Sequence, residues 1–358
     1  MSMLLIRSIS LLLLVLSPAT LLAQQVRVPE QWPTIQEAVD QASPGDVISV
    51  GPGIWNQAID LKGKPITLTG REGAAKTILD GHDLGRSVIR CVTQEKASTI
   101  VEGFTIINGT GDQELYGKKS AVGGGIVILG ASPIIRNCVF KKNTVNYEGG
   151  AVYMARESSP VFDSCIFLEN GAEKGGAVFG VQSKPTFQRC VFENNEGRYS
   201  GGAIYNSDGQ VSSFDDCHFV RNRASYYGGG IYEYGSSGKL KNCTFDRNRA
   251  TYKGGAVCNG YRGKSELVNC RFLSNYDDVA GGNAPHMTVI APEGACILTD
   301  GSCLNVTRQS CDDAAGVYRG NGIDCSSQPK TRMARSNDLN RDGRIDDRDA
   351  LMLLLLWR

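Results

Sequence analysis

Residues 149–195 read GGAVYMARESSPVFDSCIFLENGAEKGGAVFGVQSKPTFQRCVFENN, and two short phrases each occur twice in this stretch. One phrase is Gly-Gly-Ala-Val-aromatic, and the other is Cys-x-Phe-x-x-Asn. With small variations the first phrase recurs every 26 or 27 residues, starting at Gly123, Gly149, Gly175, Gly201, Gly228, Gly254 and, in degraded form, Gly281. A fixed period of this length is the signature of a repeat architecture, so this repeat decides the fold.

The repeat fits a coil of three short strands joined by turns. The second phrase interleaves with the first and begins at Cys138, Cys165, Cys190, Cys217, Cys243 and Cys270. Cys and Phe are two residues apart, so they share one strand face, and because only the residue between them varies we expect that face to be buried. The Asn three residues after Phe falls at the next turn, where stacked amides can hydrogen-bond and tolerate left-handed geometry. The prediction is an all-β, right-handed parallel β-helix.

The solenoid begins less regularly upstream of the repeat. Thr34 is a predicted N-cap for a helix that places Ile35, Ala38 and Val39 on one face, and this helix would close the N-terminal end. Further strands are predicted over residues 47–50, 66–68, 77–79, 87–92 and 104–107. Together with the regular coils this gives roughly ten rungs, or about 48 Å of stacked strands.

Composition limits the class of protein. The chain has 358 residues, with 38 Lys and Arg against 37 Asp and Glu, and this balance argues against a general nucleic-acid binder. Its 43 Gly show no Gly-X-Y period, which excludes collagen. Arg7, the apolar run Leu11–Leu16 and Ala23 are typical of a secretory signal peptide over residues 1–23, although a retained N-terminal anchor stays open. We therefore expect export, with no further membrane-spanning segment.

The twelve cysteines fall into different groups. The six of the repeat lie on neighbouring rungs, where a disulfide would be strained, so we favour buried, reduced thiols over bridges. Four others crowd into a short segment with few large apolar residues, and in an exported protein they are disulfide candidates: Cys296, Cys303, Cys311 and Cys325. The sequence does not choose among their three pairings, and a zinc knuckle is the rival interpretation. Cys91 and Cys258 are unassigned.

An acidic loop precedes the apolar run 351–357 at the end of the chain. It has oxygen ligands at calcium-loop positions 1, 3, 5, 7, 9 and 12 and Gly343 at position 6. The predicted Ca²⁺ ligands are Asp338, Asn340, Asp342, Arg344 through its carbonyl, Asp346 and Asp349. The alternative is a solvated charge run. The helix expected over the apolar run must bury one face on the solenoid or on a protein partner.

Two sets of residues are candidates for a functional site. Asp215 and Asp216, close to His218, are weak catalytic candidates, because in register Asp216 occupies a freely varying outward position. Tyr153, Phe179, Tyr205 and Tyr232 share one strand position in four successive coils. If these rings face outward they offer stacking faces to a sugar chain, which Tyr147, Tyr199, Tyr226, Tyr227 and Tyr252 could extend; if they face inward they are a core stack.

Three resemblances add to these inferences. Pro33–Asp40, Gly45–Val50 and Ile66–Gly70 resemble the opening of pectin-lyase-like β-helix proteins, which include pectinesterases. The Gly-Gly-Ala-Ile and Phe-x-x-Asn pairs resemble repeats of the polymorphic outer-membrane protein family, and residues 338–349 resemble one dockerin-type calcium repeat, which uses Asp at position 12. The first two cover about residues 26–288 and imply the β-helix fold, which hosts lyases, hydrolases, esterases and adhesins alike.

These inferences divide the chain into four parts. They are the signal peptide over residues 1–23, the β-helix over 24–288, a Cys-rich disulfide module over 289–328 and a dockerin-like calcium segment over 329–358. With no convincing catalytic cluster, the leading hypothesis is a secreted or cell-surface protein that binds polysaccharide or another surface partner without catalysis. The alternatives are an extracellular polysaccharide lyase or glycoside hydrolase, and a structural envelope protein.

Overall fold

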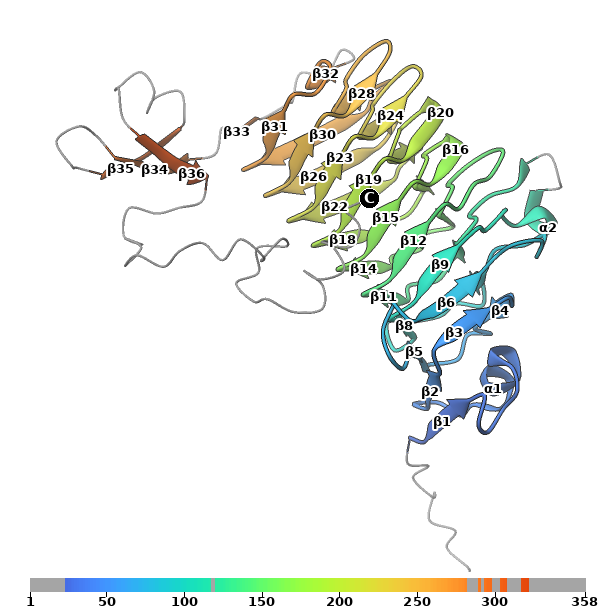
Figure 1. The fold of residues 1–358 in the computed structure, drawn as a ribbon. Coiled ribbons are helices and arrows are strands. Elements are labelled where there is room, and N and C mark those ends of the chain that lie inside the picture. Colours follow the sequence, from blue (N-terminus) through green and yellow to red (C-terminus); the bar gives the residue numbers. More distant parts are fainter. Residues whose placement is uncertain are drawn as a thin grey trace, which may run out of the picture.

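The computed structural model describes residues 23–116 and 120–281 and, beyond them, the backbone of four short strands between residues 289 and 321. The described chain winds as a coil that contributes one strand per turn to each of three long parallel sheets (Figure 1). No helix in these residues is long and apolar enough to cross a membrane.

In the described residues sheet A has eleven strands, and sheets B and C have nine each. The strands of sheet A are β1 (Gln25–Val28), β2 (Val47–Val50), β5 (Thr67–Gly70), β8 (Ile100–Glu102), β11 (Ile134–Arg136), β14 (Val161–Asp163), β18 (Thr186–Gln188), β22 (Val211–Asp215), β26 (Ser237–Lys241), β30 (Lys264–Val268) and β33 (Val289–Ile290). Those of sheet B are β3 (Gly53–Trp55), β6 (Thr77–Asp80), β9 (Thr105–Ile107), β12 (Val139–Lys141), β15 (Ile166–Leu168), β19 (Val191–Glu193), β23 (His218–Val220), β27 (Thr244–Asp246) and β31 (Arg271–Leu273). Those of sheet C are β4 (Ile59–Asp60), β7 (Ile89–Cys91), β10 (Ile126–Leu129), β13 (Val152–Ala155), β17 (Val178–Val181), β21 (Ile204–Ser207), β25 (Ile231–Tyr234), β29 (Val257–Asn259) and β32 (Val279–Gly281).

Two smaller sheets complete the described structure. Sheet D lies between sheets B and C in the later coils and has the strands β16 (Gly171–Lys174), β20 (Glu196–Ser200), β24 (Arg223–Ala224) and β28 (Arg249–Ala250). Sheet E is antiparallel, in the order β35-β34-β36, and falls in the predicted Cys-rich module: β34 (Glu293–Ile297), β35 (Cys303–Thr307) and β36 (Val317–Asn321). The side chains of sheet E lie outside the described part of the chain.

The core is built from columns of identical residues. The Phe of each Cys-x-Phe phrase stacks on the next, with ring centroids 5.0 Å apart for Phe140 and Phe167 and 4.6 Å for Phe167 and Phe192. A second column from sheet A, which contains Phe162 and Phe187, meets the first edge to face. The prediction that the face carrying the Phe of each Cys-x-Phe phrase is buried is confirmed, because Phe140, Phe167 and Phe192 are fully buried.

The Asn ladder is also confirmed. Asn143 donates from its backbone N and from Nδ2 to Oδ1 of Asn170, at 3.0 Å each, and Asn170 repeats the pattern with Asn195. The left-handed geometry, however, belongs to the residue before each Asn, such as Glu169 at φ 56°. The expectation that the Asn itself takes this conformation is wrong, because its amide must point along the stack to bond its neighbours.

The Gly-Gly phrase marks the turn into sheet C. Gly149 has a φ of 66°, and a Cβ on Gly150 would collide with the carbonyl oxygen of Gly176 on the next coil. Only glycine meets both conditions, because it alone takes positive φ freely and has no Cβ. The Gly-Gly phrase therefore recurs because each coil approaches the next closely at this turn.

The thiol ladder consists of free, buried cysteines in the described residues. Five of the six ladder thiols point to a backbone carbonyl of the preceding coil, as Cys165 Sγ does to Ile135 O at 3.5 Å, and Cys243 Sγ points to Lys241 O of its own coil at 3.3 Å. Burial raises the pKa of Cys138 to about 12, so its thiol stays neutral. Cys91 lies in the core on sheet C, opposite Ile128, and Cys258 lies on the outer side of sheet C, opposite Tyr232.

A helix follows Thr34, where one was predicted. It is α1 (Ile35–Gln41), and Thr34 Oγ1 accepts a hydrogen bond from the backbone N of Glu37 at 3.1 Å. Ile35, Ala38 and Val39 are buried in the main core, and α1 lies at the N-terminal end of the stack (Figure 1). A second short helix, α2 (Gln113–Tyr116), precedes the regular coils.

Candidate binding surface

The outer face of sheet C carries the aromatic column that the sequence singles out. Val152 and Met154 belong to the main core, so Tyr153 between them faces outward, and Phe179, Tyr205 and Tyr232 follow it in register. Ring centroids along this column are 5.6, 5.3 and 5.0 Å apart. Of the two alternatives left open by the sequence, the outward orientation is the one that the structure adopts.

The rings of this column are nevertheless covered. Tyr153, Phe179, Tyr205 and Tyr232 are only 5%, 5%, 6% and 7% exposed, and they form a second apolar cluster with Tyr147 and Tyr227 packed against it. The idea that these four rings themselves offer stacking faces to a glycan is therefore corrected, because their faces are already occupied. Burial also raises the pKa of Tyr205 and of Tyr232, which keeps both phenols neutral.

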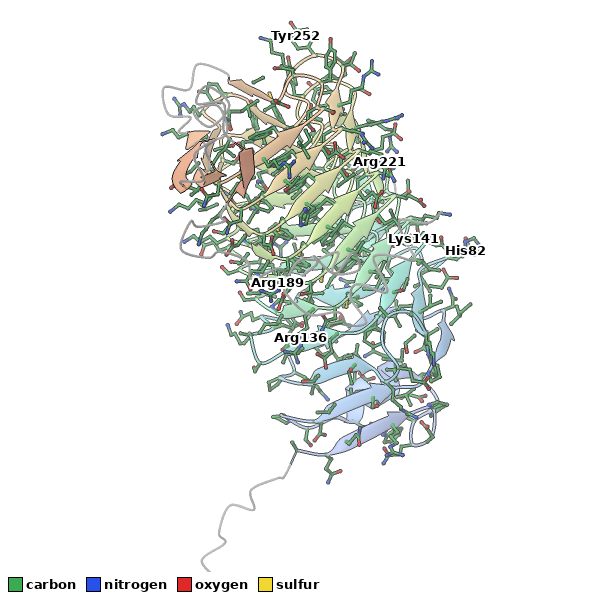
Figure 2. All side chains as sticks on the ribbon, turned by 60° about the vertical axis from the view of Figure 1, so that its left-hand side comes forward. His82, Arg136, Lys141, Arg189, Arg221 and Tyr252 are labelled. Carbon is green, nitrogen blue, oxygen red and sulfur yellow. The ribbon has the colours of Figure 1, made fainter. Side chains whose placement is uncertain are left out.

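Exposed tyrosines instead form a layer connected to this cluster. Tyr199, Tyr226 and Tyr252 lie in successive coils, and the backbone N of each later residue donates to the carbonyl of the earlier one, at 2.9 and 3.0 Å. They are 41%, 49% and 62% exposed, and the ring centroids of Tyr199 and Tyr226 are 4.9 Å apart. Tyr252 projects from the C-terminal coils in Figure 2. These three were named from the sequence as possible extensions of the column, and they supply open ring faces.

The layer continues across sheet C through two further exposed tyrosines. Half-buried Tyr227 stacks on Tyr232, with ring centroids 5.5 Å apart. The ring centroids of Tyr232 and Tyr234 are 6.3 Å apart, and those of Tyr234 and Tyr261 are 6.0 Å apart. We call this set the tyrosine surface, and it consists of Tyr199, Tyr226, Tyr227, Tyr234, Tyr252 and Tyr261. Sequence reasoning missed Tyr234 and Tyr261, because each occurs in one coil only and no repeat draws attention to it.

Cationic side chains accompany these rings. Lys253 Nζ lies 5.9 Å from the centroid of Tyr252, and the guanidinium of Arg262 lies 5.1 Å from that of Tyr261. Such contacts are worth roughly 0.5–1 kcal/mol at exposed sites and place a hydrogen-bond donor next to the ring. The surface can therefore offer both a flat apolar face and polar donors to a ligand.

A partly buried ion pair lies at the N-terminal side of the cluster. Lys174 Nζ lies 3.1 Å from Glu148 Oε1 and 5.2 Å from the ring centroid of Tyr147. Burial raises the pKa of Glu148, and the attraction of Lys174 opposes this rise. The pair fixes the turn that carries Tyr147 over the aromatic column.

The catalytic candidates lie elsewhere, at the corner between sheets A and B. Asp215 ends β22 and is exposed, and its Oδ1 accepts a hydrogen bond from Asn242 Nδ2 at 3.1 Å. Asp216 has a φ of 54°, as do the equivalent corner residues of the other coils to within a few degrees. Burial raises the pKa of Asp216, and His218 opposes this rise. The corner is thus a feature of every coil rather than a local departure from the repeat.

Other predicted sites lie outside the described residues. These are residues 1–22 of the predicted signal peptide (1–23), Cys311, Cys325, the side chains of Cys296 and Cys303, and the loop Asp338–Asp349. Within the part of the chain that the structure describes, no three His, Cys, Asp or Glu side chains gather as a metal site would require.

Comparison with known families agrees with the fold. Residues 91–250 match the family model of the right handed beta helix region, and residues 242–260 match that of the Chlamydia polymorphic membrane protein repeat. The solenoid is therefore a right-handed parallel β-helix, as predicted. No curated protein matches the chain.

Among solved structures, a pectin methylesterase from carrot is 11% identical, with 73% of this chain and 88% of that chain covered and a TM-score of 0.45. The pectin methylesterase PemA from Erwinia chrysanthemi is 12% identical, with coverages of 74% and 91% and a TM-score of 0.42. A polygalacturonase from Erwinia carotovora ssp. carotovora is also 12% identical, with coverages of 74% and 96% and a TM-score of 0.39. Likenesses this remote carry no argument about activity.

Proposed function

We propose that this protein is a secreted or cell-surface β-helix protein that binds polysaccharide without catalysis. The observation that carries the proposal is the tyrosine surface, in which exposed rings repeat at coil spacing along Tyr199, Tyr226 and Tyr252. Sugar rings have apolar faces that pack on aromatic rings, and a row of rings about 5 Å apart suits an extended chain better than a compact ligand.

Several other observations support the same proposal. Exposed aromatic side chains that gather on one flank mark an interaction site more often than scattered ones do. The covered aromatic column beneath these rings restricts their motion, so ligand binding costs little side-chain conformational entropy. Export follows from the predicted signal peptide, and Ca²⁺ bound by the loop Asp338–Asp349 would belong to the same extracellular setting.

Binding can be measured on the full chain by affinity electrophoresis and calorimetry, with plant, algal and bacterial polysaccharides and added Ca²⁺. We expect retardation by at least one polysaccharide that weakens in Tyr226→Ala and Tyr252→Ala. Tyr276→Ala is the matched control, because Tyr276 is 57% exposed but lies outside the tyrosine surface. Equal effects of all three substitutions, or no binding by folded protein, would contradict the proposal.

A second candidate is a polysaccharide lyase or glycoside hydrolase that uses Asp216. The raised pKa of this half-buried carboxyl next to His218 is the specific observation in its favour, since general acids need such a shift. Release of reducing ends or unsaturated uronides, lost in Asp216→Asn but retained in Tyr226→Ala, would establish this alternative. A structural envelope role is what remains if neither binding nor release occurs.

A further inference from the structure

The outer face of sheet B carries an apolar strip. Phe140, Phe167 and Phe192 point into the core, so the residues on either side of each point outward. On β12, β15 and β19 most of these outward residues are apolar, and together with Ala74 they form one cluster of buried side chains: Val139, Ile166, Leu168 and Val191. We call these four residues the sheet B strip.

The strip is more deeply covered than its position explains. Its residues are 3%, 7%, 4% and 8% exposed, in the order of the chain. On other coils the same outward positions are half-buried or exposed, as at Ile107, Val220 and Arg271. In the described residues no further hydrophobic side chain packs against this cluster, whereas Tyr147 and Tyr227 cover the column on sheet C. The low exposure is therefore local to three strands, and no hydrophobic side chain of the described residues outside the cluster accounts for it.

The size of the strip suits one helix. Three adjacent strands span about 10 Å across their axes, which matches the ~10–12 Å diameter of a helix with its side chains. Arg136 and Arg189 lie at the corner with sheet A, and Lys141 and Arg221 lie at the opposite ends of β12 and β23 (Figure 2). The three arginines are ion-paired with carboxylates of adjacent coils: Glu102, Asp163 and Glu193.

We propose that the C-terminal apolar segment Leu351–Trp357 of this chain covers the sheet B strip. It is a run of seven apolar residues, and the stretch before it contains five Asp and three Arg between residues 338 and 349. About 60 residues separate Ile290 on β33 from Leu351, a far longer reach than the ~19 Å of four strand spacings between β31 and β15. The other long apolar run, Leu11–Leu16, belongs to the signal peptide that we expect to be removed.

The test places a photoreactive benzoylphenylalanine at Leu354 in the full chain and maps its crosslinks by mass spectrometry. We expect crosslinks within one chain to peptides that contain Val139, Ile166, Leu168 or Val191. Leu168→Arg should lower the yield about tenfold, because a buried Leu contact is lost and a charge faces the apolar segment. Val220→Arg is the matched control, since Val220 occupies the same outward position on β23 beyond the strip.

Three outcomes would overturn the proposal. They are crosslinks confined to other surfaces, crosslinks mainly between isotopically light and heavy chains, and a yield that Leu168→Arg leaves unchanged. If Leu168→Arg does not fold, deletion of residues 350–358 gives an independent test. Carbene footprinting of Val139, Ile166, Leu168 and Val191 should then rise several-fold over the full chain, and labelling equal to that of the full chain would refute the proposal.

Discussion

Asn206 donates a hydrogen bond from Nδ2 to Oε1 of Glu233 across 2.8 Å inside the solenoid, where both side chains are buried. Ser236 Oγ donates to the other carboxyl oxygen of Glu233 at 2.6 Å. Burial raises the pKa of Glu233 to about 7, against which these two hydrogen bonds act. A carboxyl group that is half neutral near pH 7 thus lies in the interior of sheet C.

The first prediction concerns pH. Because the folded pKa of about 7 exceeds the ordinary value of 4.5, the native state holds a proton that the unfolded state has lost between these values. The free energy of unfolding should therefore be highest, as far as Glu233 contributes, below about pH 4.5. It should decrease as the pH rises towards 7 and level off above about pH 7, after a loss of about 3 kcal/mol. Urea denaturation at closely spaced pH values measures this loss.

Glu233→Gln isolates the effect, because the amide keeps the shape and the acceptor for Asn206 but does not ionise. Its Nε2 can donate to Ser236 Oγ, which then donates to the carbonyl of Asn206, 3.1 Å away. We expect the variant to gain stability over the wild type as the pH rises from 5 to 8.5. Glu266→Gln, at an exposed position of the next coil, should show no such trend, and a parallel trend in both variants would refute the assignment.

A second prediction concerns the Asn ladder. Asn195 Oδ1 accepts from both the backbone N and the Nδ2 of Asn170, and Asn195 Nδ2 donates to Phe167 O at 2.9 Å. Asn195→Ala removes these three buried hydrogen bonds, although Asn170 Nδ2 keeps its bond to Phe140 O at 2.9 Å, so we expect a loss of about 3 kcal/mol in the free energy of unfolding. Asn194→Ala, at the neighbouring exposed corner, should cost much less, and similar losses for the two variants would contradict this role.

A third prediction concerns the thiols. The eight described cysteines are free and buried, so a thiol reagent should not reach them in the native protein and should label them once the chain is unfolded. Labelling followed by peptide mapping separates these eight from the four cysteines after residue 290. Fast native labelling of Cys165 or Cys190, or a disulfide between them, would show that the ladder is not a closed column.

The solenoid was predictable because its physical constraints repeat. A contact between adjacent coils requires each of its recurring features, namely Gly149 and Gly150, the Phe column and the Asn ladder. The same residue type therefore recurs at each coil. The orientation of Tyr153 was not predictable, because all four residues of β13 are buried and the strand shows no alternation of apolar and polar residues. Both faces of sheet C are covered, and an alternating pattern arises only when one face meets water.

The features that sequence reasoning missed are those that occur once. Glu233 lies in register with Asn206 and Asn259, and no pattern in one sequence distinguishes a buried carboxyl from an exposed one at that position. Tyr261 contacts Tyr234 because the turn after β29 stacks on the turn after β25, as the hydrogen bond from Gly235 N to Tyr261 O shows at 2.6 Å. Such contacts depend on the path of individual turns, which the repeat does not specify.

A fourth prediction concerns the magnitude of ligand binding. If Tyr199, Tyr226 and Tyr252 bind one glycan chain, removal of a single ring should weaken binding about fivefold, since an aromatic contact is worth roughly 1 kcal/mol. Tyr226→Phe should retain most of the affinity, because the ring face is preserved. Calorimetric titration of the three alanine variants measures this, and an effect confined to one of them would indicate a compact ligand instead of a chain.

The last prediction concerns the C-terminal loop. If Asp338, Asp342 and Asp349 ligate Ca²⁺, Asp342→Ala should abolish the binding of one equivalent in calorimetry, because a carboxylate at position 5 has no substitute in a loop of this length. Asp347→Ala is the matched control, since position 10 carries no ligand in such loops. Binding lost in Asp342→Ala and kept in Asp347→Ala would distinguish a calcium loop from a solvated charge run. Equal affinities of both variants and the wild type would leave the acidic residues as a charged stretch before the apolar segment, and would remove Ca²⁺ from the proposed function without affecting the tyrosine surface.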